Sequence, residues 1–596
     1  MNFSYTSEYH VMKKLTFVLL LFIIATVNLI AQSWQNKIDV RLNQYEGTSD
    51  KFEFLVQFVE QPNVSHSVSI KDKTAKGTYV MQHLQSIAKK TQAEVLNILD
   101  CKGIPYQNFW IANVIWVYSD YELVENLAQR SEVKRISENS RYKMLEPINP
   151  EILAEQLDKS LEIPWGILQM NVNKVWKRGY KGEGVVIGGQ DTGYEWEHES
   201  LKSSYRGWDG TIADHNYSWH DAIHNYDPKH DIESNPCGLD SDVPCDDNNH
   251  GTHTMGTMVG ETEDMKIGVA PAAKWIGCRN MERGWGTPQS YLECFQWFLA
   301  PTDLNNQNPD PSKAPHVINN SWSCPDIEGC NPNNFDIMET AVNSLKAAGI
   351  VVVVSAGNSG PECETINTPA AIFENSFTIG AIADNEIIAP FSSRGTIAID
   401  ESNRMKPNVA APGVNVKSAI RGGNVYANYS GTSMAGPHVA GVVALLISAD
   451  PTLAGDVERI ENLIEETAIN RITSQNCAYG DGNEIPNYVY GHGTVDALAA
   501  LEKLLTETPK SKEDNLLVYP NPTNDLINFQ NIGSEGIYTL QIFSSDGKQV
   551  INQNLDYSGG NKIRTINIAS FAKGIYFYRL CNEVDSNCLE GKILKN

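Results

Sequence analysis

The sequence predicts an α/β protein in which a central parallel β-sheet is covered by helices, preceded by a small α+β domain and followed by a small all-β sandwich. Three observations predict this arrangement. Short apolar runs alternate with helical patterns over residues 160–505. Residues 32–150 mix alternating strands with helical patterns, and residues 516–596 contain alternating strands separated by turn residues. A length of 596 residues accommodates three or four domains.

The bulk composition excludes some classes of protein. With 41% hydrophobic and 20% charged residues, the chain is globular rather than disordered throughout. A formal net charge of −25 repels nucleic acid and anionic membranes. We therefore expect no nucleic-acid partner.

Residues 1–31 have the pattern of a secretory signal peptide. Lys13 and Lys14 precede an apolar run that ends in "NLIAQS", which places the cleavage near Ala31. Met12 is an alternative start, because "MKKLTF" is a compact signal opening. A membrane anchor is the other interpretation, but the run is short for a span and contains Asn28. We expect an exported protein.

Eleven cysteines in an exported chain predict disulfides. The spacing of the cysteines does not resemble that of a zinc ribbon, so structural disulfides are favoured over a zinc site. The spacing leaves the disulfide connectivity open. Cys101 stands alone in the first domain and makes the total odd. The other ten are Cys237, Cys245, Cys278, Cys294, Cys324, Cys330, Cys363, Cys477, Cys581 and Cys588.

The domain at residues 32–150 is expected to hold one antiparallel sheet, and it shows no concentrated chemistry. Its expected strands lie at 51–58, 109–119 and 133–137, and its expected helices at 77–99 and 121–130.

The central part, residues 160–505, is expected to bury its strands on both faces. The expected strands are 184–193, 274–280, 316–323, 349–360 and 376–383, and the expected helices are 290–300, 335–349 and 433–448. In such a sheet the ligand site lies at the carboxyl ends of the strands. Three strands run into polar residues there: Asp191, Asn320 with Ser321, and Asn358.

A charged linker, 506–515, leads to the C-terminal sandwich at 516–596. Its strands are separated by "PNPT" and "SSDGK", which are typical turn sequences.

Asp191, His250 and Ser433 together suit nucleophilic catalysis. A serine hydroxyl needs a base to remove its proton, and an imidazole does this near neutral pH. A carboxylate on the far imidazole nitrogen fixes the tautomer. Asn358 supplies an amide that can donate to a developing oxyanion.

Each of these residues also has a structural interpretation. Ser433 can cap a helix, Asp191 and Asn358 can form turns, and His250 with His253 can be a metal pair. "HGTH" lacks the glutamate of the HExxH zinc motif. Four structural coincidences in one chain are less plausible than one catalytic site.

"DTG", "HGTHTMGT", "SAGN" and "GTSMAGPHVAG" resemble the signature segments of subtilisin-like serine proteases, the subtilases, and the order Asp–His–Ser is that of subtilisin. "VINNSWS", "PWGILQMNVNKVW" and "YRGWDG" resemble the bacillopeptidase F type. The resemblance implies a subtilisin-like fold and a serine endopeptidase. Ser433 would form the acyl-enzyme, and Asn358 with the Ser433 backbone N–H would form the oxyanion hole.

The same resemblance implies a set of substrate-binding residues. Those expected to pair with an extended peptide are Ser321, Trp322 and Ser323, and those expected to form the facing pocket wall are Ser355, Ala356 and Gly357.

The sequence departs from compact subtilisins at residues 215–249, a long acidic loop with two cysteines. Structural calcium is one interpretation, since carboxylates are the oxygen ligands that calcium prefers. A solvated, disulfide-stapled loop is the favoured one. The chemistry itself is expected to need no cofactor.

The flanking domains carry two further resemblances. Residues 32–150 resemble the propeptide inhibitor of the same family, with processing expected between Arg141 and Pro164. Residues 516–596 resemble the sorting domain of the type IX secretion system of Bacteroidetes. The expected partners are therefore peptide substrates, the chain's own propeptide and the type IX machinery, and the expected location is secreted or cell-surface.

Two rival functions stay open. A catalytically silent surface protein of subtilase fold would bind or adhere without cutting. A serine esterase or peptide ligase would use the same three residues for another acyl transfer.

Overall fold

The computed structural model describes residues 34–144, 147–153, 163–225, 235–477, 480–507 and most of 516–595, with short gaps at 520, 522, 532–535, 546, 559–562 and 583–587. The predicted signal peptide, its cleavage site and most of the predicted linker lie outside these residues. The chain folds into two compact units, residues 1–501 and 502–596.

The N-terminal part of the first unit is an antiparallel sheet of order β2-β3-β1-β4. Two helices accompany it, and the longer, α2, is capped by the Asp72 carboxylate and ends at Gly103 in the left-handed conformation. The elements are β1 (Phe52–Phe58), α2 (Lys73–Lys102), β2 (Tyr106–Phe109), β3 (Val114–Ser119), α3 (Tyr121–Ala128) and β4 (Val133–Glu138).

The central sheet has seven parallel strands in the order β15-β14-β13-β12-β7-β9-β8. All five predicted strands are present in it, and nearly all their residues are buried, as apolar runs without alternation predict. The strands are β7 (Val186–Asp191), β8 (Trp219–Asp221), β9 (Lys274–Arg279), β12 (Val317–Asn320), β13 (Val351–Ser355), β14 (Phe377–Ile382) and β15 (Val409–Pro412).

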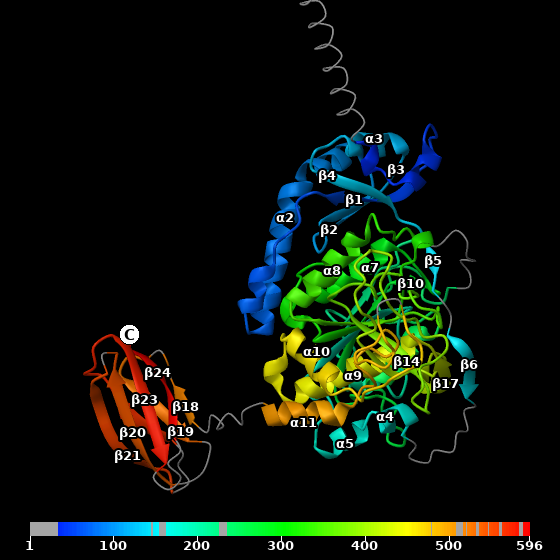
Figure 1. Cartoon of the computed structure of the whole chain (residues 1–596). Coiled ribbons are helices and arrows are strands. Elements are labelled where there is room, and N and C mark those ends of the chain that lie inside the picture. The colour runs from blue at the N-terminus through cyan, green and yellow to red at the C-terminus, as the bar shows by residue number, and fades with distance from the viewer. Residues whose placement is uncertain are drawn as a thin grey trace, which may run out of the picture. The chain divides into compact units, whose positions relative to one another are not determined.

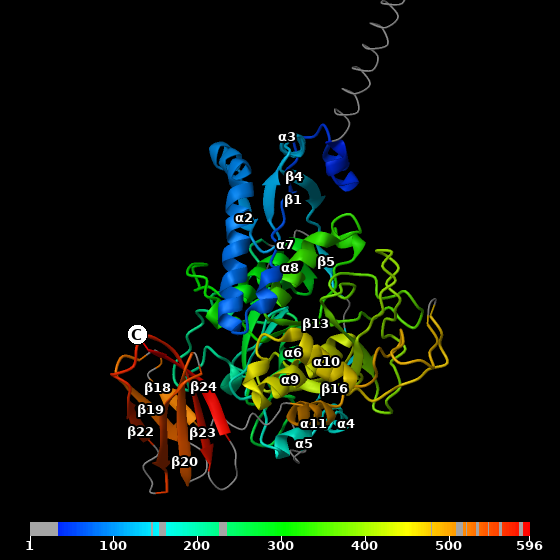
Figure 2. The same cartoon turned by 60° about the vertical axis from the view of Figure 1, so that its left-hand side comes forward.

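Helices cover this sheet (Figures 1 and 2), and the three predicted ones are among them. They are α4 (Trp165–Gln169), α5 (Val172–Lys177), α6 (His250–Val259), α7 (Pro288–Leu299), α8 (Phe335–Ala347), α9 (Thr432–Ala449), α10 (Val457–Glu466) and α11 (Ala497–Glu507). Within the described residues, α9 alone has the length and apolar composition of a membrane span, and 89% of that window is buried inside the protein. Its apolar character is therefore that of a core helix.

Two small sheets join early segments to later ones. β5 (Tyr142–Lys143) pairs with β11 (Trp285–Gly286), which also pairs with β10 (Met281–Glu282). β6 (Ile148–Leu153) pairs with β17 (Val425–Ser430), which also pairs with β16 (Val416–Ile420). Figure 1 shows β5 and β6 in cyan beside their later-coloured partners.

The second unit contains two antiparallel sheets, β18-β19-β22 and β21-β20-β23-β24. Alternate residues such as Leu540 and Ile542 point into a shared core, which fits the predicted all-β sandwich. The strands are β18 (Leu516–Tyr519), β19 (Leu526–Asn531), β20 (Ile537–Ser544), β21 (Gln549–Asp556), β22 (Ile563–Asn567), β23 (Gly574–Asn582) and β24 (Cys588–Lys595).

The ten cysteines other than Cys101 form five disulfides, whereas Cys101 is exposed and free. The pairs are Cys237–Cys245, Cys278–Cys294, Cys324–Cys330, Cys363–Cys477 and Cys581–Cys588.

Candidate active site

Asp191 and His250 meet at the carboxyl edge of the central sheet. Asp191 is the last residue of β7, and His250 is the first residue of α6. The His250 Nδ1 atom lies 2.7 Å from Asp191 Oδ1 and 2.9 Å from Oδ2. Both side chains are 1% exposed. A buried carboxylate at this distance fixes the imidazole with Nδ1 as the donor.

Small residues make this approach possible. A Cβ at Gly251 would lie 2.0 Å from the Gly193 carbonyl oxygen and 3.1 Å from Asp191 Cβ, so only glycine lets the start of α6 come this close to the end of β7. The Thr192 N–H and the Thr254 hydroxyl donate to the Asp191 carboxylate at 2.7 and 3.4 Å. These two bonds fix the orientation of the carboxylate toward His250.

Ser433 lies at the start of α9, which packs against α6. It is the second residue of that helix, and the residue is 9% exposed in the full chain. Its hydroxyl is 3.4 Å from the Ser321 carbonyl oxygen, and the Ser321 hydroxyl donates to the Ser433 carbonyl at 3.0 Å. The helix N-terminus brings backbone N–H groups and a positive dipole end to this point.

Asn358 follows β13 and lies beside the start of α9. Its Oδ1 accepts from the Thr432 N–H and hydroxyl, both at 2.9 Å. These two bonds orient the Asn358 amide so that its nitrogen, Nδ2, points away from Thr432. The ideal Cβ position on Gly431 is 3.3 Å from Asn358 Nδ2 and 3.7 Å from Ser433 N, so the two donors lie on the same small region, which glycine leaves open.

The other predicted residues surround this region. β12 ends at Asn320, so the observed strand is shorter than the expected one at 316–323. Ser321, Trp322 and Ser323 therefore follow the strand instead of ending it. The Trp322 ring is buried and stacks on the Tyr291 ring, with 3.8 Å between the ring centroids. Only the backbone of Trp322 can therefore face a ligand.

The facing segment is anchored to the same helix start. Ser355 and Ala356 are buried, and the Ser355 hydroxyl donates to the Asn320 carbonyl at 3.4 Å. Gly357 has φ +102°, which favours glycine, and its N–H donates to the Thr432 hydroxyl at 3.1 Å.

Sequence reasoning missed the β10–β11 hairpin, which pairs with β5. Its two-residue turn, Arg283 and Gly284, has φ of +51° and +86°, as a type I′ turn requires. Met144 donates its N–H to the Gly284 carbonyl at 2.8 Å, continuing the β5–β11 pairing. "ERGWG" carries the turn signal, but such short strands leave no periodicity to find.

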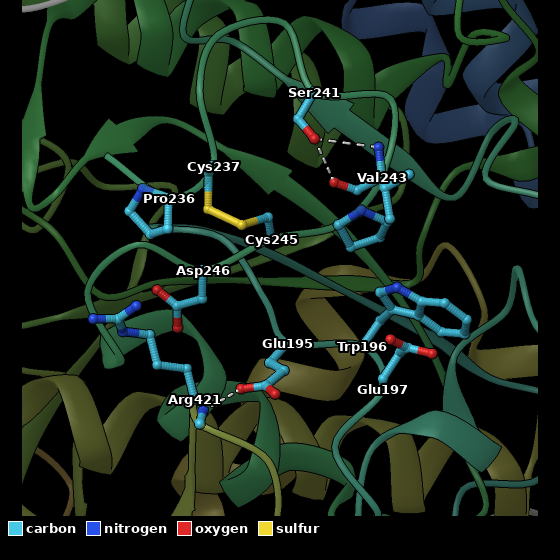
Figure 3. Close-up of a pocket in the computed structure, with 12 residues that line it drawn as sticks. Glu195, Trp196, Glu197, Pro236, Cys237, Ser241, Val243, Cys245, Asp246 and Arg421 are labelled. Atoms are coloured by element: carbon cyan, nitrogen blue, oxygen red, sulfur yellow. Dashed lines mark hydrogen bonds between the residues drawn. A yellow bond between two sulfur atoms is a disulfide. The ribbon is translucent and has the colours of Figure 1, made fainter. Parts of the chain in front are cut away.

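The loop at 215–249 is stapled by Cys237–Cys245 and borders a pocket of about 460 Å³ (Figure 3). Asp246 lines it, and its carboxylate accepts bonds from Thr192 and Thr252 at 2.9 and 2.6 Å. The Glu195 carboxylate accepts from the backbone N–H of Gly422 across the pocket at 2.6 Å. These carboxylates serve as structural acceptors, which favours the stapled-loop interpretation.

Neither metal interpretation gains a ligand set from the described residues, among which no group of three or more His, Cys, Asp or Glu is arranged for a metal. The His253 Nε2 atom lies 3.0 Å from the Val416 carbonyl oxygen. Burial lowers the pKa of this imidazole to about 3. His253 is therefore a neutral core residue and not half of a metal pair.

A second buried cluster lies near the hairpin. Arg279 bridges Asp221, at 3.1 Å, and Asp247. Burial raises the pKa of Asp247 to about 6, although Arg279 opposes the shift. The cluster fixes the end of β9 just before the β10–β11 hairpin.

Two family models match the sequence. One, described as the subtilase family, matches residues 182–493. The other, described as a secretion system C-terminal sorting domain, matches residues 517–594.

Several curated proteins are similar. Bacillopeptidase F of Bacillus subtilis is 34% identical over 503 residues, which is 79% of this chain and 33% of that protein. Subtilisin DY of Bacillus licheniformis is 30% identical over 344 residues, which is 57% of this chain and 99% of that protein. The chain thus spans about a third of the length of bacillopeptidase F. The predicted resemblance to this type and to the sorting domain is confirmed.

Among solved structures, the epidermin leader peptide processing serine protease of Staphylococcus aureus covers 76% of this chain and 98% of its own, with a TM-score of 0.53 and 17% identity. At that identity the likeness supports the fold, and the predicted α/β architecture is confirmed.

Proposed function

The chain belongs to the subtilase family, and from this premise we propose that it is a secreted serine endopeptidase made as a zymogen. The observation that carries the proposal is the buried Asp191–His250 pair at 2.7 Å, with Ser433 and the Asn358 amide at the start of the helix packed against α6.

In the proposed mechanism, His250 Nε2 takes the proton of the Ser433 hydroxyl as the serine oxygen attacks the peptide carbonyl. Asp191 stabilises the imidazolium through Nδ1. The tetrahedral oxyanion accepts hydrogen bonds from Asn358 Nδ2 and the Ser433 N–H. His250 then returns the proton to the leaving amine, which gives the acyl-enzyme, and water attacks the ester by the same steps in reverse. Protein groups alone supply this chemistry.

We propose that substrates bind as extended peptides between two backbone walls. The first is the β11 edge, Trp285 and Gly286, and the second is Ser321–Ser323. The pairing of β5 with β11 supports this proposal, because β5 extends the sheet edge as a bound peptide does in β-augmentation. Ser355, Ala356 and Gly357 would form the wall of the pocket for the residue before the cut.

We also propose that residues 32–150 are the inhibitory propeptide of the peptidase domain at 160–505. The domain at residues 32–150 packs on α7 and α8 of the peptidase domain. The Gln296 side chain in α7 accepts from the Trp110 N–H at 2.7 Å, and the Ser344 hydroxyl in α8 donates to the Ile111 carbonyl at 3.1 Å. Figure 2 shows α2 beside α8, which it contacts.

The processing site can then be narrowed. Met144 lies against Gly284, whose ideal Cβ position is 3.7 Å from Asn248 Nδ2, near His250. Ile148 pairs with Ser430, three residues before Ser433. Met144 thus lies near the start of the helix that begins with His250, and Ile148 lies near the start of the helix that carries Ser433. We propose that the cut falls between Met144 and Pro147.

The matched sorting domain indicates secretion or attachment at the cell surface. We propose that residues 1–31 direct export across the inner membrane, that 516–596 direct passage through the type IX machinery, and that 506–515 link this domain to the peptidase.

The test is the maturation of Ser433→Ala. We expect this variant to lose peptide hydrolysis by at least about 1000-fold and to retain its propeptide, because cutting is proposed to be autocatalytic. Gel mobility and N-terminal sequencing follow the processing. Ser203→Ala, at an exposed serine, is the control and should mature normally. Normal maturation of Ser433→Ala would contradict self-processing, and retained hydrolysis would contradict the nucleophile.

The rival functions give different results in the same assays. A silent binding protein would hydrolyse no peptide. An esterase or ligase would favour ester hydrolysis or acyl transfer over peptide hydrolysis in one sample.

A further inference from the structure

A single buried carboxylate touches both segments that carry the Asp191–His250 pair. Asp246 is 4% exposed, and its Oδ1 atom accepts from the Thr192 hydroxyl at 2.9 Å. Its Oδ2 atom accepts from the N–H and the hydroxyl of Thr252, at 3.0 and 2.6 Å. Thr192 directly follows Asp191, and Thr252 comes two residues after His250. The Asp246 side chain therefore connects the end of β7 to the start of α6.

The Thr192 hydroxyl is a direct link between the two segments. It donates to Asp246, and it accepts from the N–H of Gly251, the residue after His250, at 3.0 Å. The backbone N–H of Thr192 donates to Asp191 Oδ1 at 2.7 Å. Thr192 is fully buried, so these bonds are shielded from water. A shift of Thr192 would therefore move Asp191 relative to His250.

The start of α6 depends on Asp246, because the helix's own N-cap residue supplies no side-chain bond. Asn249, at the N-cap, has φ +120° and makes no side-chain cap hydrogen bond. Its N–H donates to Asp246 Oδ1 at 3.0 Å, and the N–H of Asn248 donates to the same atom at 2.9 Å. A non-glycine residue at positive φ is strained and persists only where its surroundings hold it. The carboxylate therefore fixes the turn that brings His250 to Asp191.

Asp246 has a support of its own outside α6. Figure 3 shows it beside the disulfide that Cys245, the residue before it, forms with Cys237. The Cys245 carbonyl accepts from the Tyr194 N–H at 3.2 Å, and a bridge of antiparallel type joins Asp246 to Gly193. The carboxylate is thus held by the segment that follows β7 and can place the start of the helix from there.

We propose that Asp246 is a positioning residue of the peptidase: its carboxylate, with the Thr192 hydroxyl as the link, sets the position of Asp191 relative to His250. This inference rests on the proposed peptidase function and deepens it. Asp246 acts through its neighbours and not on the substrate. Because proton transfer depends steeply on the placement of the imidazole, a displaced pair slows the chemical step without weakening substrate binding.

The test compares Thr192→Val with Thr192→Ser, each expressed as the full chain and assayed after maturation. Valine keeps the shape of threonine, removes the hydroxyl and changes no charge, whereas serine keeps the hydroxyl. On one peptide substrate we expect Thr192→Val to lower kcat about 10- to 100-fold with KM unchanged. Thr192→Ser should stay close to the wild type. Each kcat is expressed per active site, counted by fluorophosphonate labelling to completion, so that a loss of folded protein does not lower it.

Asp246→Asn should lower kcat to a similar extent, because its amide nitrogen faces donors where the carboxylate has acceptors. The double variant with Thr192→Val should lose much less activity than the product of the two single losses, since both changes break one link. Asp264→Asn, at an exposed aspartate beyond the other end of α6, is the matched control and should keep the wild-type kcat.

A wild-type kcat per active site in Thr192→Val or in Asp246→Asn would overturn the positioning role and leave the peptidase proposal intact. Equal losses in Thr192→Val and Thr192→Ser would assign the effect to packing and would also overturn it. A wild-type protein that hydrolyses no peptide would instead overturn the proposed function. Either variant decides the question alone if the other fails to fold.

Discussion

In the proposed mechanism, Asn358 would serve structure and chemistry at once. Its oxygen ties the residue to Thr432, at the N-terminus of the helix that carries Ser433. Its nitrogen is thereby left on the side of Gly431 and the Ser433 N–H. The sequence motif "SAGN" placed this residue after a buried strand, but its double attachment to Thr432 follows only from the folded geometry.

Asn358→Asp separates the two roles. Aspartate keeps the oxygen that accepts from Thr432 but cannot donate to an oxyanion. We expect kcat to fall about 100- to 1000-fold with little change in KM, because the lost bond forms mainly in the transition state. Steady-state kinetics on one peptide substrate measures both constants. A rise in KM with unchanged kcat would contradict the oxyanion role.

At the scale of elements, the buried strands and helices were predictable because their apolar patterns are long and continuous. β7, β12 and β13 all end near the polar residues that the sequence singled out. The pairings β5–β11 and β6–β17 were not predictable, since they join short segments more than 100 residues apart. The disulfide Cys363–Cys477, with a separation of 114, was hidden for the same reason.

Helix α9 contains a titrating group that couples its burial to pH. His438 Nδ1 donates to the Met434 carbonyl at 2.8 Å, and burial lowers the pKa of this imidazole to about 4. In the unfolded chain the pKa of histidine is about 6.5. Between pH 6.5 and 4 the unfolded state therefore binds one more proton at this site than the folded state. Acidification over this range removes about 3 kcal/mol of stability.

His438→Asn in a Ser433→Ala background, which prevents self-digestion, should remove this contribution. We expect the free energy of unfolding of the parent to fall, relative to that of the variant, by about 1.4 kcal/mol per pH unit below pH 6.5. Urea unfolding at several pH values measures the difference. Exposed His66→Asn is the control and should give a curve parallel to that of the parent. Parallel curves for His438→Asn would contradict a neutral buried imidazole.

At the scale of the whole molecule, the order of the parts fits the proposed zymogen, which would be exported before it becomes active. The N-terminal domain packs on α7 and α8, and the chain then adds the short strand β5 to the edge of β11. The peptidase follows, and a sorting domain ends the described chain. Sequence patterns predicted this order because each part has its own composition and motifs, whereas the contacts between the first two parts depend on surfaces that a pattern does not show.

The most direct test of the account is covalent labelling of the purified mature protein with a fluorophosphonate, followed by mass spectrometry of the labelled peptide. A working relay from Asp191 through His250 makes the serine hydroxyl react with such a probe. The account predicts close to one label per molecule, on Ser433, and its loss in His250→Ala. Folded mature protein that carries no label on Ser433 would contradict it.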